Sequence, residues 1–201
     1  MNKVRQREGG RGRDLVSLTV PVRAVDHGLW HPRWSVHKFI DHRERVFKAA
    51  HVEGLSLEYL VENFELMDAL KFKGNCLLNE GINELWTLVA GTGATKFDNG
   101  NAYIGVGDTA SPAADPAQTG LQAPTNKKYN AMDTSFPTYG SSQKVTHRST
   151  FASGDANFAW AEITVANGNS DAAKNLNRKV QAMGTKAVGT SWVATHETTL
   201  S

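Results

Sequence analysis

The sequence is poor in residues that build covalent or metal cross-links, since its 201 residues include a single cysteine, Cys76. One thiol excludes an intramolecular disulfide and any zinc cluster built from several cysteines. We expect Cys76 to be a small buried side chain at the start of a helix.

Long apolar runs are also missing. No stretch reaches the roughly 18 to 20 apolar residues of a membrane-spanning helix, and the N-terminus lacks the apolar segment of a signal peptide. The mean hydropathy is −0.41 and the formal net charge is +2. We therefore expect a soluble protein with no membrane partner, and so small a charge disfavours nucleic acid as a partner.

The motifs of common active sites are absent. In YIGVGDTASP a dinucleotide site would need a third glycine and a following helix, but Pro112 and Pro116 come next. A P-loop lysine beside serine or threonine is missing, as are the GxSxG and HExxH motifs. We interpret Gly105 and Gly107 as a strand that ends in tight backbone bends. We predict no catalytic residue, no cofactor-binding residue and no enzyme.

Acidic and histidine side chains occur without a metal-binding spacing. Four loop aspartates lack the DxDxDG pattern, and we interpret them as turn formers, which leaves a local calcium site open. Five histidines close in sequence predict a histidine-rich surface or interface. We predict no metal-binding residue. The aspartates are Asp98, Asp108, Asp115 and Asp133, and the histidines are His27, His31, His37, His42 and His51.

Positive charge gathers at the N-terminus, where four arginines stand within the first 14 residues. Such a segment is either a solvated end or an arm that docks on an acidic protein surface or on nucleic acid. We assign residues 1–74 to an N-terminal arm and extension, in which SLTVPV could add a strand to a neighbour's sheet. The arginines are Arg5, Arg7, Arg11 and Arg13.

The tryptophans fall into two groups. In LWHPRW an arginine stands beside two tryptophans, and exposed aromatic residues of this kind are typical anchors for a protein partner. The other three are predicted to lie in the core or on a sheet face. The predicted partner-binding residues are Arg5, Arg7, Arg11, Arg13, Trp30 and Trp34, and the predicted interior tryptophans are Trp86, Trp160 and Trp192.

Residues 77–90 predict one helix packed against a sheet. Its apolar residues recur at spacings of about four, three and four, which places them on one face. We expect Gly91 to end this helix in the left-handed conformation and Glu80 and Glu84 to lie on a solvated face. The apolar residues are Leu78, Ile82, Leu85 and Val89.

The remainder of the chain predicts strands. In NFAWAEITV the alternation places Phe158, Trp160 and Glu162 on one face and the small and aliphatic residues on the other. Consecutive strands without intervening helices cannot form parallel βαβ units. We predict a mainly β fold, an antiparallel β-sandwich or jelly-roll-like body over residues 75–201. The expected strands are RWSVHKFI, NAYIGVG, KVTHRSTF, NFAWAEITVAN, NLNRKVQAM and SWVATHETTL.

Two segments do not fit this pattern. LSLEYLVENFELMDALKF is compatible with a helix or a strand and is left undecided. The proline-rich stretch after Gly107 predicts a long surface loop.

Five segments, in chain order, carry a likeness to known proteins: NCLLNEGINELWTLVAGTGAT, FDNGNAYIGVGDTASPAADPAQTGLQA, NKKYNAMDTSFPT, FASGDANFAWAEITVANG and NLNRKVQAMGTKAVGTSWVATHETTLS. Together they resemble a family of bacteriophage virion structural proteins of poorly assigned role. The resemblance covers residues 75–201 and implies a structural component assembled in the host cytoplasm, with no catalytic residues to transfer.

From this resemblance we expect a capsid decoration or cement protein, that is, a minor capsid protein. It would bind the major capsid protein or other virion proteins in homo-oligomeric or lattice-repeated copies and stabilise the shell. One alternative is a tail, neck or fibre adaptor of the virion. Another is a carbohydrate-binding or glycan-hydrolysing jelly roll, for which Phe158, Trp160 and Glu162 are the local group.

Overall fold

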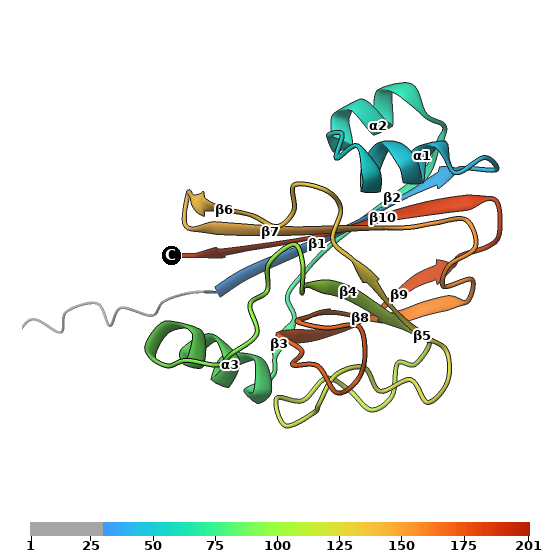
Figure 1. Ribbon diagram of the computed structural model, residues 1–201. Helices are drawn as coiled ribbons and strands as arrows, with labels where there is room; N and C mark the ends of the chain where they lie inside the picture. Colours follow the sequence, from blue (N-terminus) through green and yellow to red (C-terminus); the bar gives the residue numbers. More distant parts are fainter. Residues whose placement is uncertain (1–29) are drawn as a thin grey trace, which may run out of the picture.

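A computed structural model describes residues 30–201 and shows two antiparallel five-stranded sheets packed face to face (Figure 1). This confirms the predicted mainly β, sandwich-like fold. Sheet A contains β1 (Trp30–Ile40), β2 (Leu66–Lys73), β6 (Thr138–Ser141), β7 (Lys144–Phe151) and β10 (Thr190–Leu200), in the order β2-β1-β10-β7-β6. Sheet B contains β3 (Cys76–Leu77), β4 (Tyr103–Gly107), β5 (Lys127–Ala131), β8 (Ala159–Ala166) and β9 (Asn177–Thr185), in the order β3-β9-β8-β4-β5.

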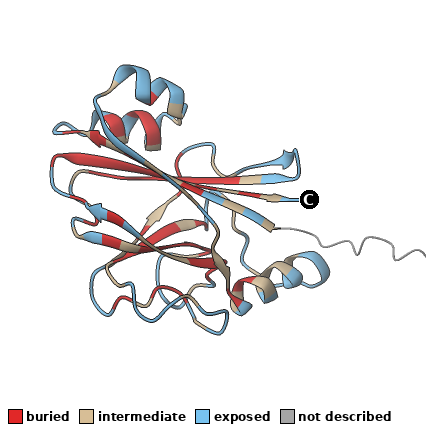
Figure 2. Ribbon diagram, turned by 180° about the vertical axis from the view of Figure 1, so that it is seen from behind, coloured by how far each residue is buried: buried red, intermediate tan, exposed pale blue. Residues whose placement is uncertain are grey.

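The main core lies between the two sheets. Alternate residues of each strand point inward, so the buried positions gather on the facing sides of the sheets (Figure 2). At its centre the Trp160 ring stands edge-on to Phe151 and Trp192, with centroid separations of 4.6 and 4.7 Å. The predicted interior positions of Trp160 and Trp192 are confirmed, since both are buried.

Strands β1 and β2 belong to the body of the protein. Strand β1 pairs with β10 along its whole length, from Trp30 opposite Leu200 to Ile40 opposite Thr190. Residues 30–73 therefore do not form an extension outside the sandwich, and the boundary that we placed at residue 74 does not separate the sheets. The predicted SLTVPV strand lies outside the described residues.

The undecided segment contains both a helix and a strand. The hydroxyl of Ser56 accepts a hydrogen bond from the backbone N–H of Tyr59 at 3.2 Å and caps α2 (Leu57–Asn63). Phe64 then has an extended backbone, and β2 follows. Leu60 gives the helix its buried contact.

A helical cap, residues 45–63, covers one end of the outer face of sheet A (Figure 1). It consists of α1 (Arg45–Phe47), the π-helix η1 (Lys48–Val52) and α2. Its apolar residues pack on that face and form a second core, separate from the main one. The second core contains Phe39, Val46, Ala49, Ala50, Leu60 and Val193.

The predicted helix is present as α3 (Asn79–Ala90), but its packing differs from the prediction. Gly81 lies so close to the backbone of Leu176 that no Cβ would fit, which brings the first turn against sheet B. The last turns leave the body, since Trp86 is 65% and Val89 77% exposed. The interior prediction for Trp86 is therefore wrong, and the apolar stripe is covered from Leu78 to Leu85 but not at Val89.

Polar contacts complete the attachment of α3. Glu80 accepts a hydrogen bond from the backbone N–H of Asn175 at 2.9 Å, and Glu84 accepts one from that of Thr95 at 2.8 Å. The carboxylates of Glu80 and Glu84 therefore attach the helix to the body, whereas we predicted that both would lie on a solvated helix face. Gly91 has φ −129°, so it is not left-handed as expected.

Two predictions for small residues also fail. Cys76 is half-buried in the short strand β3 and not in a helix. Gly105 lies in the middle of β4, and its backbone is not left-handed. An added Cβ there would stand 2.6 Å from the Tyr129 ring and 2.9 Å from Thr164 Cγ2. Close approach of neighbouring strands, and not a bend, requires glycine there.

Residues 108–126 contain no helix or strand, as predicted for this loop. The buried carboxylate of Glu162 accepts a hydrogen bond from the backbone N–H of Ala123 in this loop at 2.7 Å. The same carboxylate accepts one from Arg178 Nε at 2.6 Å. Arg178 Nη1 in turn donates to the carbonyl of Pro112 at 2.9 Å. A long loop is thus fixed by a buried ion pair on sheet B.

We expect Gly105→Ala to lower the free energy of unfolding by about 1–3 kcal/mol, because the methyl group forces the Tyr129 ring and strand β8 apart. Urea denaturation monitored by tryptophan fluorescence measures this. Gly154→Ala is the control, since an added Cβ there meets nothing within 4 Å. Equal stability of the two variants would contradict the close-approach explanation.

Candidate partner-binding surface

The outer face of sheet A beyond the helical cap carries polar side chains. Strand alternation places Arg33, Ser35 and His37 on the side opposite the buried Trp34 and Val36. The register then aligns these residues with polar residues of the neighbouring strands, so a polar strip crosses β2, β1 and β10. The aligned pairs are Arg33 with Lys73 and Glu197, and Ser35 with Lys71 and Thr195.

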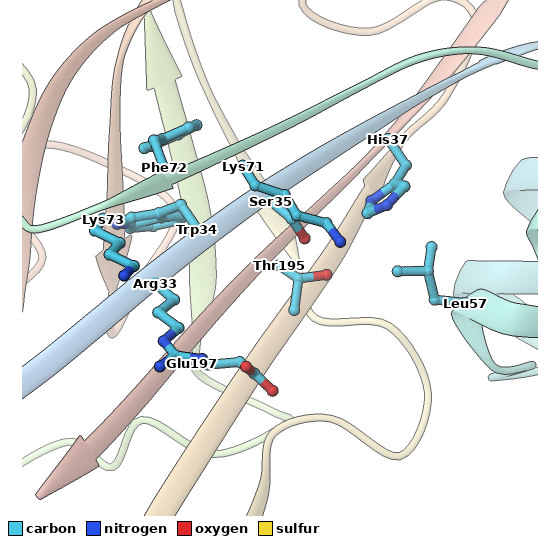
Figure 3. Close-up of a pocket in the computed structure, with 10 residues that line it drawn as sticks. All are labelled: Arg33, Trp34, Ser35, His37, Leu57, Lys71, Phe72, Lys73, Thr195 and Glu197. Atoms are coloured by element: carbon cyan, nitrogen blue, oxygen red, sulfur yellow. The ribbon is translucent and has the colours of Figure 1, made fainter.

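This strip borders a groove of about 480 Å³ between the sheet and Leu57 at the start of α2 (Figure 3). We call it the outer groove. It has the size of an ordinary ligand-binding cleft. Its lining residues are Arg33, Trp34, Ser35, His37, Leu57, Lys71, Phe72, Lys73, Thr195 and Glu197.

The outer groove has an excess of positive charge. Arg33, Lys71 and Lys73 are exposed, and none of them forms an ion pair with any residue of the described chain. Glu197 is paired with Lys144 at 3.0 Å. Like charges directly opposite on adjacent strands, such as Arg33 and Lys73, destabilise a sheet.

Two buried polar atoms in the outer groove lack hydrogen-bond partners within residues 30–201. They are Nδ1 of His37, a side chain that is 6% exposed, and Oγ1 of Thr195. Burial, followed by the nearby charge of Lys71, lowers the pKa of His37. The ring is therefore neutral at pH 7 and offers one nitrogen as donor and one as acceptor.

The helical cap that walls the outer groove is held by a buried ion pair. Arg148 Nε donates to Asp133 Oδ2 at 2.7 Å, and both side chains are almost fully buried. The other guanidinium nitrogens donate to the carbonyls of Leu55 at 2.8 Å and Ala50 at 3.0 Å. The amide of Thr150 donates to Asp133 Oδ1 at 2.9 Å. The pair thus joins sheet A to the cap.

A second buried polar cluster lies between the sheets. The His196 ring is tilted against the Trp34 ring with a centroid separation of 4.4 Å, and the His147 ring lies 5.8 Å from that of His196 on the neighbouring strand. Burial lowers the pKa of His147 to about 4, and burial together with His147 lowers the pKa of His196 well below its usual range. Neither ring nitrogen of His147 has a partner in the described chain. Both rings are neutral in the folded protein at pH 7.

The predicted aromatic and arginine anchors do not form one surface. Trp34 is 2% exposed in the main core, so its prediction as an exposed anchor is wrong. Trp30 is half-buried and packs against the same core. The four predicted arginine contacts lie outside the described residues. These are Arg5, Arg7, Arg11 and Arg13.

The five histidines close in sequence do not gather on one surface. His27 lies outside the described residues, and His31 and His42 are exposed. His37 is buried, whereas His51 is partly buried with Nδ1 3.0 Å from Asp133 Oδ1. The predicted histidine-rich surface is therefore wrong, because β1 and the helical cap direct these rings to different environments.

The loop aspartates divide into turn formers and a buried ion. Asp98 accepts from the backbone N–H of Asn101 at 3.2 Å, and Asp115 from that of Ala117 at 2.8 Å, as predicted for turns. Asp133 also begins a turn, since its carbonyl accepts from the backbone N–H of Phe136 at 3.0 Å, but its carboxylate is fully buried against Arg148, which the prediction did not include. Among residues 30–201, no three histidine, cysteine, aspartate or glutamate side chains converge as metal ligands would.

The residues on which the carbohydrate alternative rests, Phe158, Trp160 and Glu162, do not form an exposed sugar-binding surface. Trp160 and Glu162 are buried, and Glu162 is occupied by Arg178 at 2.6 Å. Phe158 packs against the main core. The alternation predicted along β8 holds only in part, because the register shifts between Trp160 and Glu162: Trp160 packs in the main core with Ile163, whereas Glu162 contacts the loop of residues 108–126. Both faces of β8 are covered, one by sheet A and the other by that loop.

Sequence reasoning missed the outer groove. Its available signals were the polar residues at alternate positions in RWSVH and KFK, which indicate a polar strand face. The pairing of these two segments with each other and with the end of the chain was not readable from either.

No family model matches the chain, and neither the curated proteins nor the solved structures contain a match. None of the helices in residues 30–201 combines the length and the apolar character needed to cross a membrane.

We expect Asp133→Asn to lower the free energy of unfolding by about 3–5 kcal/mol at pH 7, because the buried Arg148 charge loses its counter-ion. Chemical denaturation measures the change. Glu53→Gln is the control, since its pair with Lys48 is long at 3.8 Å and exposed, and we expect a loss below about 1 kcal/mol. A loss below about 1 kcal/mol for Asp133→Asn would refute a structural role for the pair.

We also expect stability to fall as the pH drops from about 6.5 toward 4. His147 has a lowered pKa when folded, so the unfolded state binds more protons in this window, and the loss is about 1.4 kcal/mol per pH unit for each such histidine. His147→Leu should reduce the loss measured by denaturation at pH 7 and pH 5, whereas His31→Gln, at an exposed site, should keep it. An unchanged pH dependence in His147→Leu would contradict this origin.

Proposed function

We propose that the protein is a structural component of a bacteriophage virion, of the capsid decoration or cement kind, and that it works by binding shell subunits in repeated copies. The resemblance of residues 75–201 to virion structural proteins supports this proposal. A sandwich whose long loops are fixed by buried ion pairs also suits a protein that must present a constant surface to a lattice.

The exposed end of α3 is the observation that carries the proposal. Trp86 and Val89 are three positions apart, so they share one helical face, and both are mostly solvent-exposed. A helix held on one side by Glu80, Glu84 and Leu85 can offer its opposite side and its end to a partner. Tryptophan is among the residues that most often contribute large binding energies at protein interfaces. Figure 1 shows α3 at one end of the sandwich, where it is open to a neighbour.

A weak contact at α3 is sufficient for such a protein. Many copies on a repeating shell sum their contributions, and a second attachment on the same chain raises the effective concentration of the first. An ordinary specific interface buries about 1,600 Å² in total, of which a tryptophan supplies 150 Å² or more. The proposed activity needs no chemical step.

The direct test is to locate the chain in purified particles. Mass spectrometry should find it in stoichiometric amounts, and electron cryomicroscopy should place it as repeated density on the head. Density on the tail or neck would instead identify the adaptor alternative. Particles that assemble without any copy of the chain would overturn the proposal.

We expect Trp86→Ala to weaken binding to particles lacking the protein by about 10-fold or more, because it removes a central apolar contact. Co-sedimentation at a series of protein concentrations measures the change. Tyr139→Ala is the matched control, since this aromatic side chain is 78% exposed but lies on β6. Equal affinities of wild type and Trp86→Ala would exclude α3 as the attachment point.

A further inference from the structure

The floor of the outer groove contains hydrogen-bonding groups that nothing in the described chain uses. Buried polar atoms without partners are rare in folded proteins, because each one costs free energy that exposure to water would recover. Here Nδ1 of His37 and Oγ1 of Thr195 are two such atoms in one groove. Figure 3 shows both side chains among the residues that line the groove. A bound group with its own donors and acceptors would satisfy them.

The rim specifies the charge of that group. Arg33, Lys71 and Lys73 form no ion pair within the described chain, and Glu197, the carboxylate opposite Arg33, is paired with Lys144, so the groove keeps a net positive charge. A carboxylate placed beside these exposed cations gains favourable Coulomb energy, which salt in the solution screens. The like-charge pair of Arg33 and Lys73, which is unfavourable in the free sheet, therefore becomes favourable when an anionic partner binds.

The surroundings favour a peptide over nucleic acid. Strand β2 is the edge of sheet A, and its outer backbone groups pair with no described strand. An extended segment could pair with this edge and present alternate side chains to the groove. The apolar side chain of Leu57 gives the far wall a surface for an aliphatic side chain of such a peptide.

We propose that the outer groove binds an extended acidic segment of a neighbouring protein. Carboxylates of the segment pair with Arg33, Lys71 and Lys73, and its polar groups hydrogen-bond to His37 and Thr195. That the neighbour is a virion protein rests on the proposed function. The groove chemistry itself depends only on the residues of this chain.

The test uses the full-length protein and a fluorescein-labelled octapeptide of alternating glutamate and threonine. Fluorescence anisotropy at low salt should give a dissociation constant tighter than about 1 mM. The affinity should fall as salt rises, because the rim charges are exposed. A labelled oligothymidylate of equal charge and inorganic sulfate are the competing probes.

Two variants locate the binding. Lys71→Gln with Lys73→Gln should weaken peptide binding about 10-fold or more, whereas Lys48→Gln with Lys96→Gln removes the same charge outside the groove and should change it less than twofold. Thr195→Val keeps shape and charge and should cost about 5-fold through the lost hydrogen bond. Circular dichroism should show every variant folded.

Each outcome decides the proposal. Loss confined to the groove variants supports it. Equal loss in both lysine pairs, an undiminished affinity in Thr195→Val, or no peptide binding overturns it, and tighter binding of the oligothymidylate replaces it with a nucleic-acid site. Groove-dependent peptide binding by a chain that is absent from particles would reject the proposed function alone. A chain present in particles that does not bind the peptide would reject the groove alone.

Discussion

The buried ion pair of Arg148 and Asp133 is the interaction on which the described architecture most depends. It joins β7, the segment after β5 and the carbonyls of the helical cap, which come from three distant parts of the chain. A guanidinium out of water must fill its donors with fixed acceptors, so this pair dictates where the cap sits. The cap then covers the second core and supplies the wall of the outer groove.

The two faces of sheet A explain how one fold combines a core with binding surfaces. The inner face of β1 carries Trp34 and Val36 into the main core, while the outer face carries Arg33, Ser35 and His37. The cap encloses only part of that outer face, which leaves a polar groove open. The proposed attachment through α3 and the proposed acidic-segment groove lie on different elements, so a particle could use both contacts at once.

Sequence patterns located the strands well and the partners of side chains poorly. KVTHRSTF coincides with β7, and the helix was displaced by only two residues at its start. Trp34 and Trp86 were misassigned, and the burial of the Asp133 carboxylate was not predicted, for one shared reason: burial depends on which segment packs on a residue. Gly105 was interpreted as a bend because the sequence does not show that the Tyr129 ring crosses it.

Local periodicity by itself determined that residues 75–201 form antiparallel strands and the helix α3, because side-chain alternation and helical spacing depend only on neighbours in sequence. Only the tertiary structure decided which face of each strand is buried, and which charges stand together without a counter-ion. The pairing of β1 with β2 and β10 brings residues from opposite ends of the described chain into one groove. Such long-range register is set by the packing of the whole sandwich, so no single segment encodes it.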